Sequence, residues 1–164
     1  MRVMKKILSQ LHTFVLWALV SAMFWSWVFT FVTDTSPDRK VTVYVKAPEL
    51  RATELAVALE ASMPEGLRMI QVHAFDYVMF GVDEFYRGDI FILPGSERET
   101  YAELLAPLDA TGDALIYDAA AGKGVATEYI RYGGEDYFLY LGTGSTHLTD
   151  GKAQAVARAL LALE

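Results

Sequence analysis

The chain has 164 residues, no cysteine and a formal net charge of −7 at pH 7. The lack of cysteine excludes disulfides, zinc–thiolate sites, thiol nucleophiles and lipid attachment through a cysteine. Three basic residues lie within the first six positions, so the chain from residue 33 onward holds 11 basic against 21 acidic residues and carries a formal charge of −10. A domain of this charge is repelled by nucleic acid, which excludes that class of partner.

The first predicted element is a membrane-spanning helix at residues 14–32, which contain no charged residue. A helix of that length is about 28 Å long, close to the roughly 30 Å apolar core of a bilayer. Residues 1–13 are then a basic cytoplasmic N-terminus, because positive flanks stay inside, and residues 33–40 are a linker to an extracytoplasmic domain. A signal peptide cleaved after Ala22 is the alternative, but the apolar run continues for ten residues beyond that position.

The first part of the domain, which spans residues 41–164, alternates apolar segments of strand length with segments of helical periodicity. Strands are expected at 41–45, 66–75 and 89–93, and helices at 49–63 and 94–108. Pro48 suits the first turn of one helix, and Ser96 with Glu99 forms a capping-box pattern at the start of the other. A short irregular or helical connection is expected at 76–88. This alternation predicts βαβ units and parallel strands.

The second part of the domain is richer in aromatic residues. A short strand is expected at 114–118, and a hairpin from 126–132 and 137–142, joined by the turn "GGED". Residues 152–163 place alanine, valine and leucine on one helical face. The predicted fold class is α/β: a three-layer α/β/α domain with a mostly parallel mixed sheet, a C-terminal hairpin and a C-terminal helix.

The segments "VTVYV", "GDIFILP" and "LLAPLD", in their βαβα order, resemble the first lobe of extracytoplasmic solute-binding proteins, the substrate-capturing partners of ABC importers. The resemblance covers about residues 41–109. It implies a doubly wound lobe outside the cytoplasm. Those proteins close two lobes on a ligand, and this chain has length for one, so the resemblance implies a degenerate lobe that acts as an accessory or sensor subunit.

The stretch "LGTGSTHL", residues 141–148, invites a search for chemistry. It lacks the third glycine of a dinucleotide loop, and Ser145 lacks the flanking glycines of a nucleophile elbow. Around Lys123 the Walker A pattern also fails. We interpret the stretch as a loop whose glycines supply positive φ, followed by a helix that Thr149 or Asp150 caps. The three histidines show no metal-ligand spacing, and no metal or cofactor is predicted.

A candidate contact surface follows from the rule that open α/β sheets bind ligands beyond the carboxyl ends of their strands. Its predicted members are Glu49, Asp76, Tyr77, Ser96 and Glu97, joined by Thr143, Ser145 and His147 if the strand before that loop runs parallel to the first three. Two functions remain open. One is a non-catalytic binding or accessory domain beside an envelope or transporter protein, and the other is a small hydrolase that uses the acids of this edge.

Overall fold

The computed structural model describes residues 2–33, 36–75, 83–108 and 113–163, and the chain divides into two units, Met1–Thr35 and Ser36–Glu164. Helix α1 (Arg2–Thr33) makes up the first unit. Its stretch Leu11–Phe29 is long and apolar enough to cross a membrane, and none of it is buried against the rest of the protein. The predicted membrane-compatible helix is confirmed. A signal sequence meets the same criteria of length and composition, so the alternative of a cleaved signal peptide stays open.

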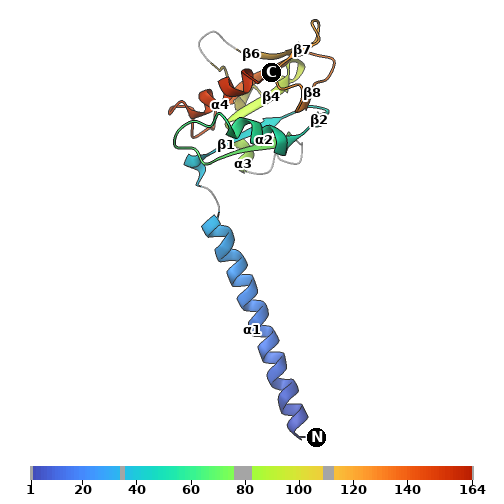
Figure 1. Ribbon diagram of the computed structural model, residues 1–164, viewed down its shortest axis with the longest axis vertical. Coiled ribbons are helices and arrows are strands. Elements are labelled where there is room, and N and C mark those ends of the chain that lie inside the picture. The colour runs from blue at the N-terminus through green and yellow to red at the C-terminus, as the bar shows by residue number, and fades with distance from the viewer. Residues whose placement is uncertain (1, 34–35, 76–82, 109–112, 164) are drawn as a thin grey trace. The chain divides into compact units, whose positions relative to one another are not determined.

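The second unit is built on a seven-stranded mixed sheet (Figure 1). In spatial order its strands are β3 (Met69–Ala74), β1 (Lys40–Val45), β4 (Ile90–Pro94), β9 (Tyr137–Gly142), β6 (Ala114–Asp118) and β7 (Lys123–Gly124), with β5 (Leu105–Ala106) paired to β9. Strands β3, β1 and β4 are parallel, with Val43 opposite both Val72 and Ile90. Strand β9 then runs antiparallel to β4 and β6. The strands predicted in the first part of the domain, and those at 114–118 and 137–142, are confirmed.

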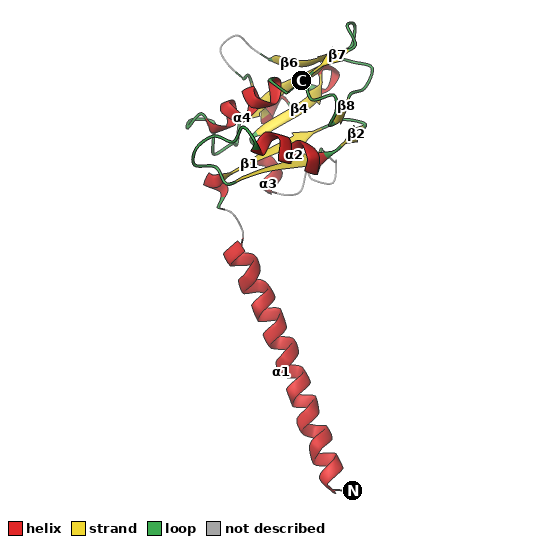
Figure 2. Cartoon of the chain, viewed as in Figure 1, coloured by secondary structure: helices red, strands yellow, loops and turns green. Residues whose placement is uncertain are grey.

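Two helices, α2 (Ala52–Glu60) and α4 (Lys152–Leu161), lie on one face of this sheet (Figure 2). They bury Leu55, Leu59, Val156 and Leu160 against the β-branched residues of the strands. The other face carries a second, largely aromatic cluster of Tyr44, Phe75, Phe85, Phe91, Leu93 and Tyr140, in which Phe85 comes from the short helix α3 (Asp83–Tyr86). The α/β fold class and the C-terminal helix are confirmed.

The helix expected at 94–108 is wrong. Two short 3-10 helices stand there, η3 (Gly95–Glu97) and η4 (Ala102–Leu104), followed by strand β5. Of the apolar side chains whose spacing suggested a helical face, Tyr101, Leu104 and Leu105 pack on the aromatic cluster and Leu108 packs on the larger cluster. However, residues 105 and 106 form strand hydrogen bonds with β9, and Pro107 has no N–H for a continuing helix. Sheet pairing overrides the local helical preference, since short helices depend on tertiary packing.

The pairing expected for the hairpin is also wrong. Strand β8 (Ile130–Arg131) pairs with β2 (Glu49–Leu50) in a separate two-stranded sheet, whereas β9 lies between β4 and β6. Because the backbone N–H of Arg51 donates to the carbonyl of Tyr129 at 2.9 Å, residues 49–51 belong to this small sheet. Helix α2 therefore begins at Ala52, and Pro48 precedes a strand instead of occupying a first helical turn.

Candidate functional site

The loop at residues 141–148 lies at the amino ends of the parallel strands. This follows from the direction of β9, whose antiparallel pairing with β4 brings Leu141 opposite Ile90 at the start of that strand. The condition under which Thr143, Ser145 and His147 would join the acids at the carboxyl edge is therefore not met. The loop instead contacts Asp89 just before β4 and residues at the start of β1.

The two glycines of this loop serve a close approach of two backbones. A Cβ atom on Gly142 would lie 1.9 Å from the carbonyl oxygen of Gly88, and one on Gly144 would lie 2.1 Å from that of Tyr86. Neither glycine has positive φ, which is confined to Gly66, Gly122 and Gly151 among the glycines that the structure describes. The expectation of positive φ in this loop is therefore wrong, and the glycines are required because a side chain has no room.

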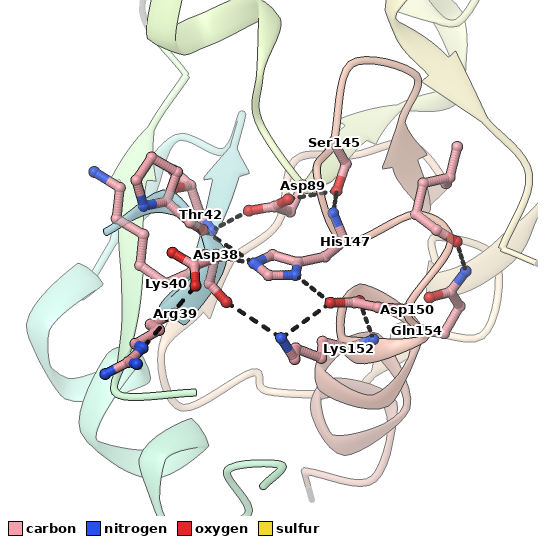
Figure 3. Close-up of polar contacts among 12 residues, drawn as sticks. Asp38, Arg39, Lys40, Thr42, Asp89, Ser145, His147, Asp150, Lys152 and Gln154 are labelled. Carbon is pink, nitrogen blue, oxygen red and sulfur yellow. Dashed lines mark hydrogen bonds and ion pairs between the residues drawn. The ribbon is translucent and has the colours of Figure 1, made fainter. Parts of the chain in front are cut away.

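Ser145 and Asp89 form the first half of a polar network (Figure 3). The Ser145 hydroxyl bonds to the Asp89 carboxylate and accepts the backbone N–H of His147 at 3.0 Å. The other Asp89 oxygen accepts the backbone N–H of Thr42 at 2.8 Å. Asp89 is 3% exposed, and burial raises the pKa of its carboxyl group above the ordinary value. This half of the network ties β1, β4 and the loop together.

His147 forms the second half, with a ring that is 1% exposed. Its Nδ1 lies 2.9 Å from a carboxylate oxygen of Asp150, and its Nε2 lies 3.1 Å from the carbonyl oxygens of both Pro37 and Lys40. All three of these neighbours are hydrogen-bond acceptors, so the ring is held from both of its nitrogens. Burial alone would raise the pKa of Asp150, but its hydrogen bonds with His147 and Lys152 outweigh that effect and lower the pKa to about 2.

This geometry does not assemble a nucleophile and its base. The Ser145 hydroxyl is bonded to Asp89 and to a backbone amide, and both nitrogens of the His147 ring point at other groups. The network instead fastens the segment at residues 37–40 to the loop and to the start of α4. We call this network of Asp89, Ser145, His147 and Asp150 the clamp. Asp150 completes it by accepting the Lys152 N–H at 3.0 Å, although Gly151 occupies the position directly before the helix.

At the carboxyl edge, two of the predicted acids are each paired with a cation. Glu49 lies 2.9 Å from Arg131, and Glu97 binds Lys46, which follows β1. The Lys46 ammonium also lies 5.5 Å from the ring centroids of Phe75 and Tyr101. Two of the three acids on which the hydrolase hypothesis depends are therefore held in ion pairs.

Of the other predicted contact residues, Ser96 lies at the same edge, exposed and next to Glu97 in the chain. At the opposite edge, the Thr143 hydroxyl donates to the carbonyl of Glu103 at 2.9 Å and so holds η4 against the loop. Asp76 and Tyr77 lie outside the described residues. No group of three or more histidine, aspartate or glutamate side chains is placed to hold a metal ion within the ranges that the structure describes.

A pocket of about 110 Å³ adjoins the clamp, and sequence reasoning missed it. Its floor is made by alternate residues of β1 and β3, which lie side by side with Thr42 opposite Gln71 and Tyr44 opposite His73. The remaining lining residues come from the ends of strands and from the loop: Pro37, Lys40, Arg87, Asp89 and Thr146. The available signal was the polar alternation at 40, 42, 71 and 73, which predicts a sheet face that no helix covers.

Comparisons of the chain with protein-family models, with curated proteins and with solved structures give no match. Within the residues that the structure describes, the features that bear on function are the apolar helix, the network around His147 and the adjoining pocket.

Proposed function

We propose that the chain is a single-pass membrane protein whose C-terminal unit is an extracytoplasmic, non-catalytic binding or accessory domain. One observation carries this proposal: the apolar side chains of Leu11–Phe29 are uncovered by the rest of the protein. The domain, by contrast, packs its own apolar residues into two clusters. A helix that is apolar on all sides and uncovered by protein is stable in lipid and not in water.

A binding role is favoured over hydrolysis by the state of the polar groups. Ser145 and His147 are each engaged with other partners, and Glu49 and Glu97 are each paired with a cation. General acid–base catalysis requires a carboxyl group that is able to exchange a proton with the substrate. An acid held in an ion pair is poorly suited to that role, so no described feature favours the hydrolase.

The same proposal includes the resemblance to solute-binding proteins: the domain is a degenerate solute-binding lobe that acts beside an envelope or transporter protein. Its support is the parallel order β3-β1-β4, with the first strand in the middle and α2 joining β1 to β3, as in half of a doubly wound sheet. Ligands of such sheets bind beyond the strand ends where the order reverses, here between β1 and β4. The Lys46–Glu97 ion pair joins the ends of these two strands, which favours contact through the surface over solute capture.

The anchor is tested by expressing the full chain, extracting membranes with alkaline carbonate and measuring the intact mass. We expect a membrane-bound protein with the mass of the full 18.2 kDa chain. A mature N-terminus at Met23 would contradict the anchor and leave a secreted domain.

The orientation is tested by cysteine labelling, for which the chain offers a clean background because it contains no cysteine. Ser9→Cys reports on the N-terminal side of the helix, and Thr127→Cys reports on an exposed position of the domain. A membrane-impermeant maleimide applied to intact cells should label only Thr127→Cys, and both variants should be labelled after lysis. Labelling of Ser9→Cys alone in intact cells would reverse the proposed orientation.

A further inference from the structure

The pocket beside the clamp gathers basic side chains that the rest of the domain leaves unpaired. Six of the 11 lysine and arginine residues after residue 33 form an ion pair with a carboxylate. Lys40 and Arg87 form none with any residue that the structure describes, yet both line this pocket together with His73. In a domain with about twice as many acidic as basic residues, a pocket lined by two cations that have no described ion pair and by one carboxylate, Asp89, is an unusual concentration of positive charge.

The other polar groups of the pocket complement this charge. Thr42, Gln71 and Thr146 bring two hydroxyl groups and one amide, all able to donate hydrogen bonds. The Gln71 amide nitrogen also donates to the sulfur of Met69 at 3.3 Å, which uses one of its two N–H groups. Asp89 is the one carboxylate among the lining residues, and its two oxygens already bond to the Thr42 N–H and to the Ser145 hydroxyl. The unused hydrogen-bonding capacity of the lining is therefore mainly that of donors.

We propose that this pocket binds a single phosphate group. The guanidinium of Arg87 offers the paired donors that match phosphate oxygens, and the ammonium of Lys40 adds a point charge. The volume of about 110 Å³ lies below the roughly 300–1,000 Å³ of pockets that enclose drug-sized ligands, so it fits a charged group and not a whole sugar or peptide.

Two sources carry this group, a soluble phosphate and the headgroup of an anionic phospholipid. Only six residues separate Lys40 from the end of α1, so the test must distinguish the two. The pocket lies wholly within Ser36–Glu164, and the proposal stands whether or not the N-terminal helix is cleaved. Its failure and the failure of the anchor are therefore separate results.

The test uses the full chain in maltoside micelles that contain no phosphate. Inorganic phosphate is titrated against chloride at equal ionic strength, and the amide NMR shifts of Thr42, Gln71 and Thr146 are followed. We expect a saturable shift with phosphate only. In the second arm, the same amides are compared in nanodiscs of phosphatidylglycerol and of phosphatidylcholine, both in a buffer without inorganic phosphate. A shift specific to phosphatidylglycerol identifies the headgroup of the anionic lipid as the source.

The variant that tests the site is Lys40→Gln with Arg87→Gln, which should weaken phosphate binding at least tenfold. The matched control is Arg68→Gln with Arg158→Gln, which removes the same charge from exposed residues outside the pocket and should change the affinity less than twofold. Near-UV circular dichroism of the tyrosines, all nine of which follow residue 40, verifies folding. Arg87→Lys keeps the charge without the paired donors and should give an intermediate affinity.

Two results would overturn the proposal. One is the absence of a saturable shift in both the phosphate arm and the phosphatidylglycerol arm. The other is an equal loss of affinity in the control variant, which would reduce the effect to net charge. A shift in only one arm supports the proposal and assigns the source of the phosphate group.

Discussion

At the scale of single residues, His147 shows how a buried polar side chain stabilises a small domain that has no disulfide. Its ring connects Asp150 to the carbonyl oxygens of Pro37 and Lys40 and leaves neither ring nitrogen without an acceptor. A hydrogen bond to a charged group is worth about 1.5–3 kcal/mol, so the bond to the Asp150 carboxylate alone is a sizeable part of the roughly 5–15 kcal/mol net stability of a domain.

The Asp150 carboxylate predicts a defined pH dependence. Its pKa is lowered from 3.8 to about 2, so its contribution to stability is fully present above about pH 4 and is lost as the pH falls through about 2. The difference in unfolding free energy between wild type and Asp150→Asn should be constant from pH 6 to 4 and shrink toward pH 2. Urea unfolding of the full chain in micelles, followed by tyrosine near-UV circular dichroism, measures it.

The control for this prediction is Glu54→Gln, which removes an ion pair of two exposed side chains. Such pairs contribute about 0–1 kcal/mol, so this variant should stay close to wild type at every pH. A difference for Asp150→Asn that widens as the pH falls would contradict the assignment of Asp150 as a stabilising anion.

Two tyrosines, one buried and one half-buried, predict opposite effects of the same substitution. The buried Tyr140 hydroxyl has no hydrogen-bond partner among the residues that the structure describes, whereas that of the half-buried Tyr132 donates to the carbonyl of Val125 at 2.8 Å. Tyr140→Phe should therefore leave the unfolding free energy unchanged or raise it by up to about 1 kcal/mol, and Tyr132→Phe should lower it by about 1 kcal/mol. Equal losses in the two variants would mean that the Tyr140 hydroxyl has a partner after all.

At the residue scale, contacts between near neighbours in the sequence could be expected, whereas contacts between distant positions could not. Thr149 or Asp150 was expected to cap the last helix; Gly151 occupies the cap position instead, and the Asp150 carboxylate accepts the backbone N–H of Lys152 two residues away. The burial of His147 was not expected, since its partners Pro37 and Lys40 lie more than 100 positions away. Hydrogen bonds of that range are set by the tertiary fold, which local spacing does not report.

At the scale of elements, the loop at 141–148 is defined by how closely it approaches the turn before β4. Gly142→Ala would place a Cβ atom against the carbonyl of Gly88, a backbone atom that is unable to move aside as a flexible side chain does. We expect this variant to lose about 3 kcal/mol of unfolding free energy or more, and Gly144→Ala to behave alike for the same reason.

The matched control is Gly134→Ala, because a Cβ atom there meets nothing within 4 Å. This variant should be at least as stable as wild type, since alanine restricts the unfolded chain. Chemical denaturation of the three variants compares them directly. If Gly142→Ala were as stable as Gly134→Ala, the backbones at 88 and 142 would have to be further apart than described.

The predicted elements were most accurate where periodicity and burial agreed. Helix α4 buries Ala153, Val156, Ala157 and Leu160, the face expected from the sequence. The segment from 95 to 106 has a similar apolar spacing, yet it folds into two 3-10 helices and a strand because β9 offers it hydrogen bonds. The spacing of apolar residues indicates which side chains are buried. The backbone conformation of such a segment also depends on whether a neighbouring strand offers it hydrogen bonds.

At the scale of the whole molecule, the α/β class, the membrane-compatible helix and the five longer strands of the central sheet were predictable because each rests on a run of local sequence, whereas the two-residue strands β5 and β7 were not predicted. The direction of β9 was not. Five of its six residues are buried, and a buried run fits a central strand in either direction. That one reversal moved Thr143, Ser145 and His147 to the opposite edge of the sheet from Glu49 and Glu97.

The clamp around His147 also has a mechanical consequence. The chain enters the domain at Ser36, and within five residues it is fastened by His147 to the loop and, through Asp150, to the start of α4. Under the proposed membrane anchoring, tension applied through the chain before Ser36 therefore reaches these hydrogen bonds before it reaches the pairing of β1 with β3 and β4. Because His147 and Asp150 connect residues 37–40 to the start of α4, such a force is distributed over α4 as well as β1. Strand β1 is therefore less easily separated from the sheet.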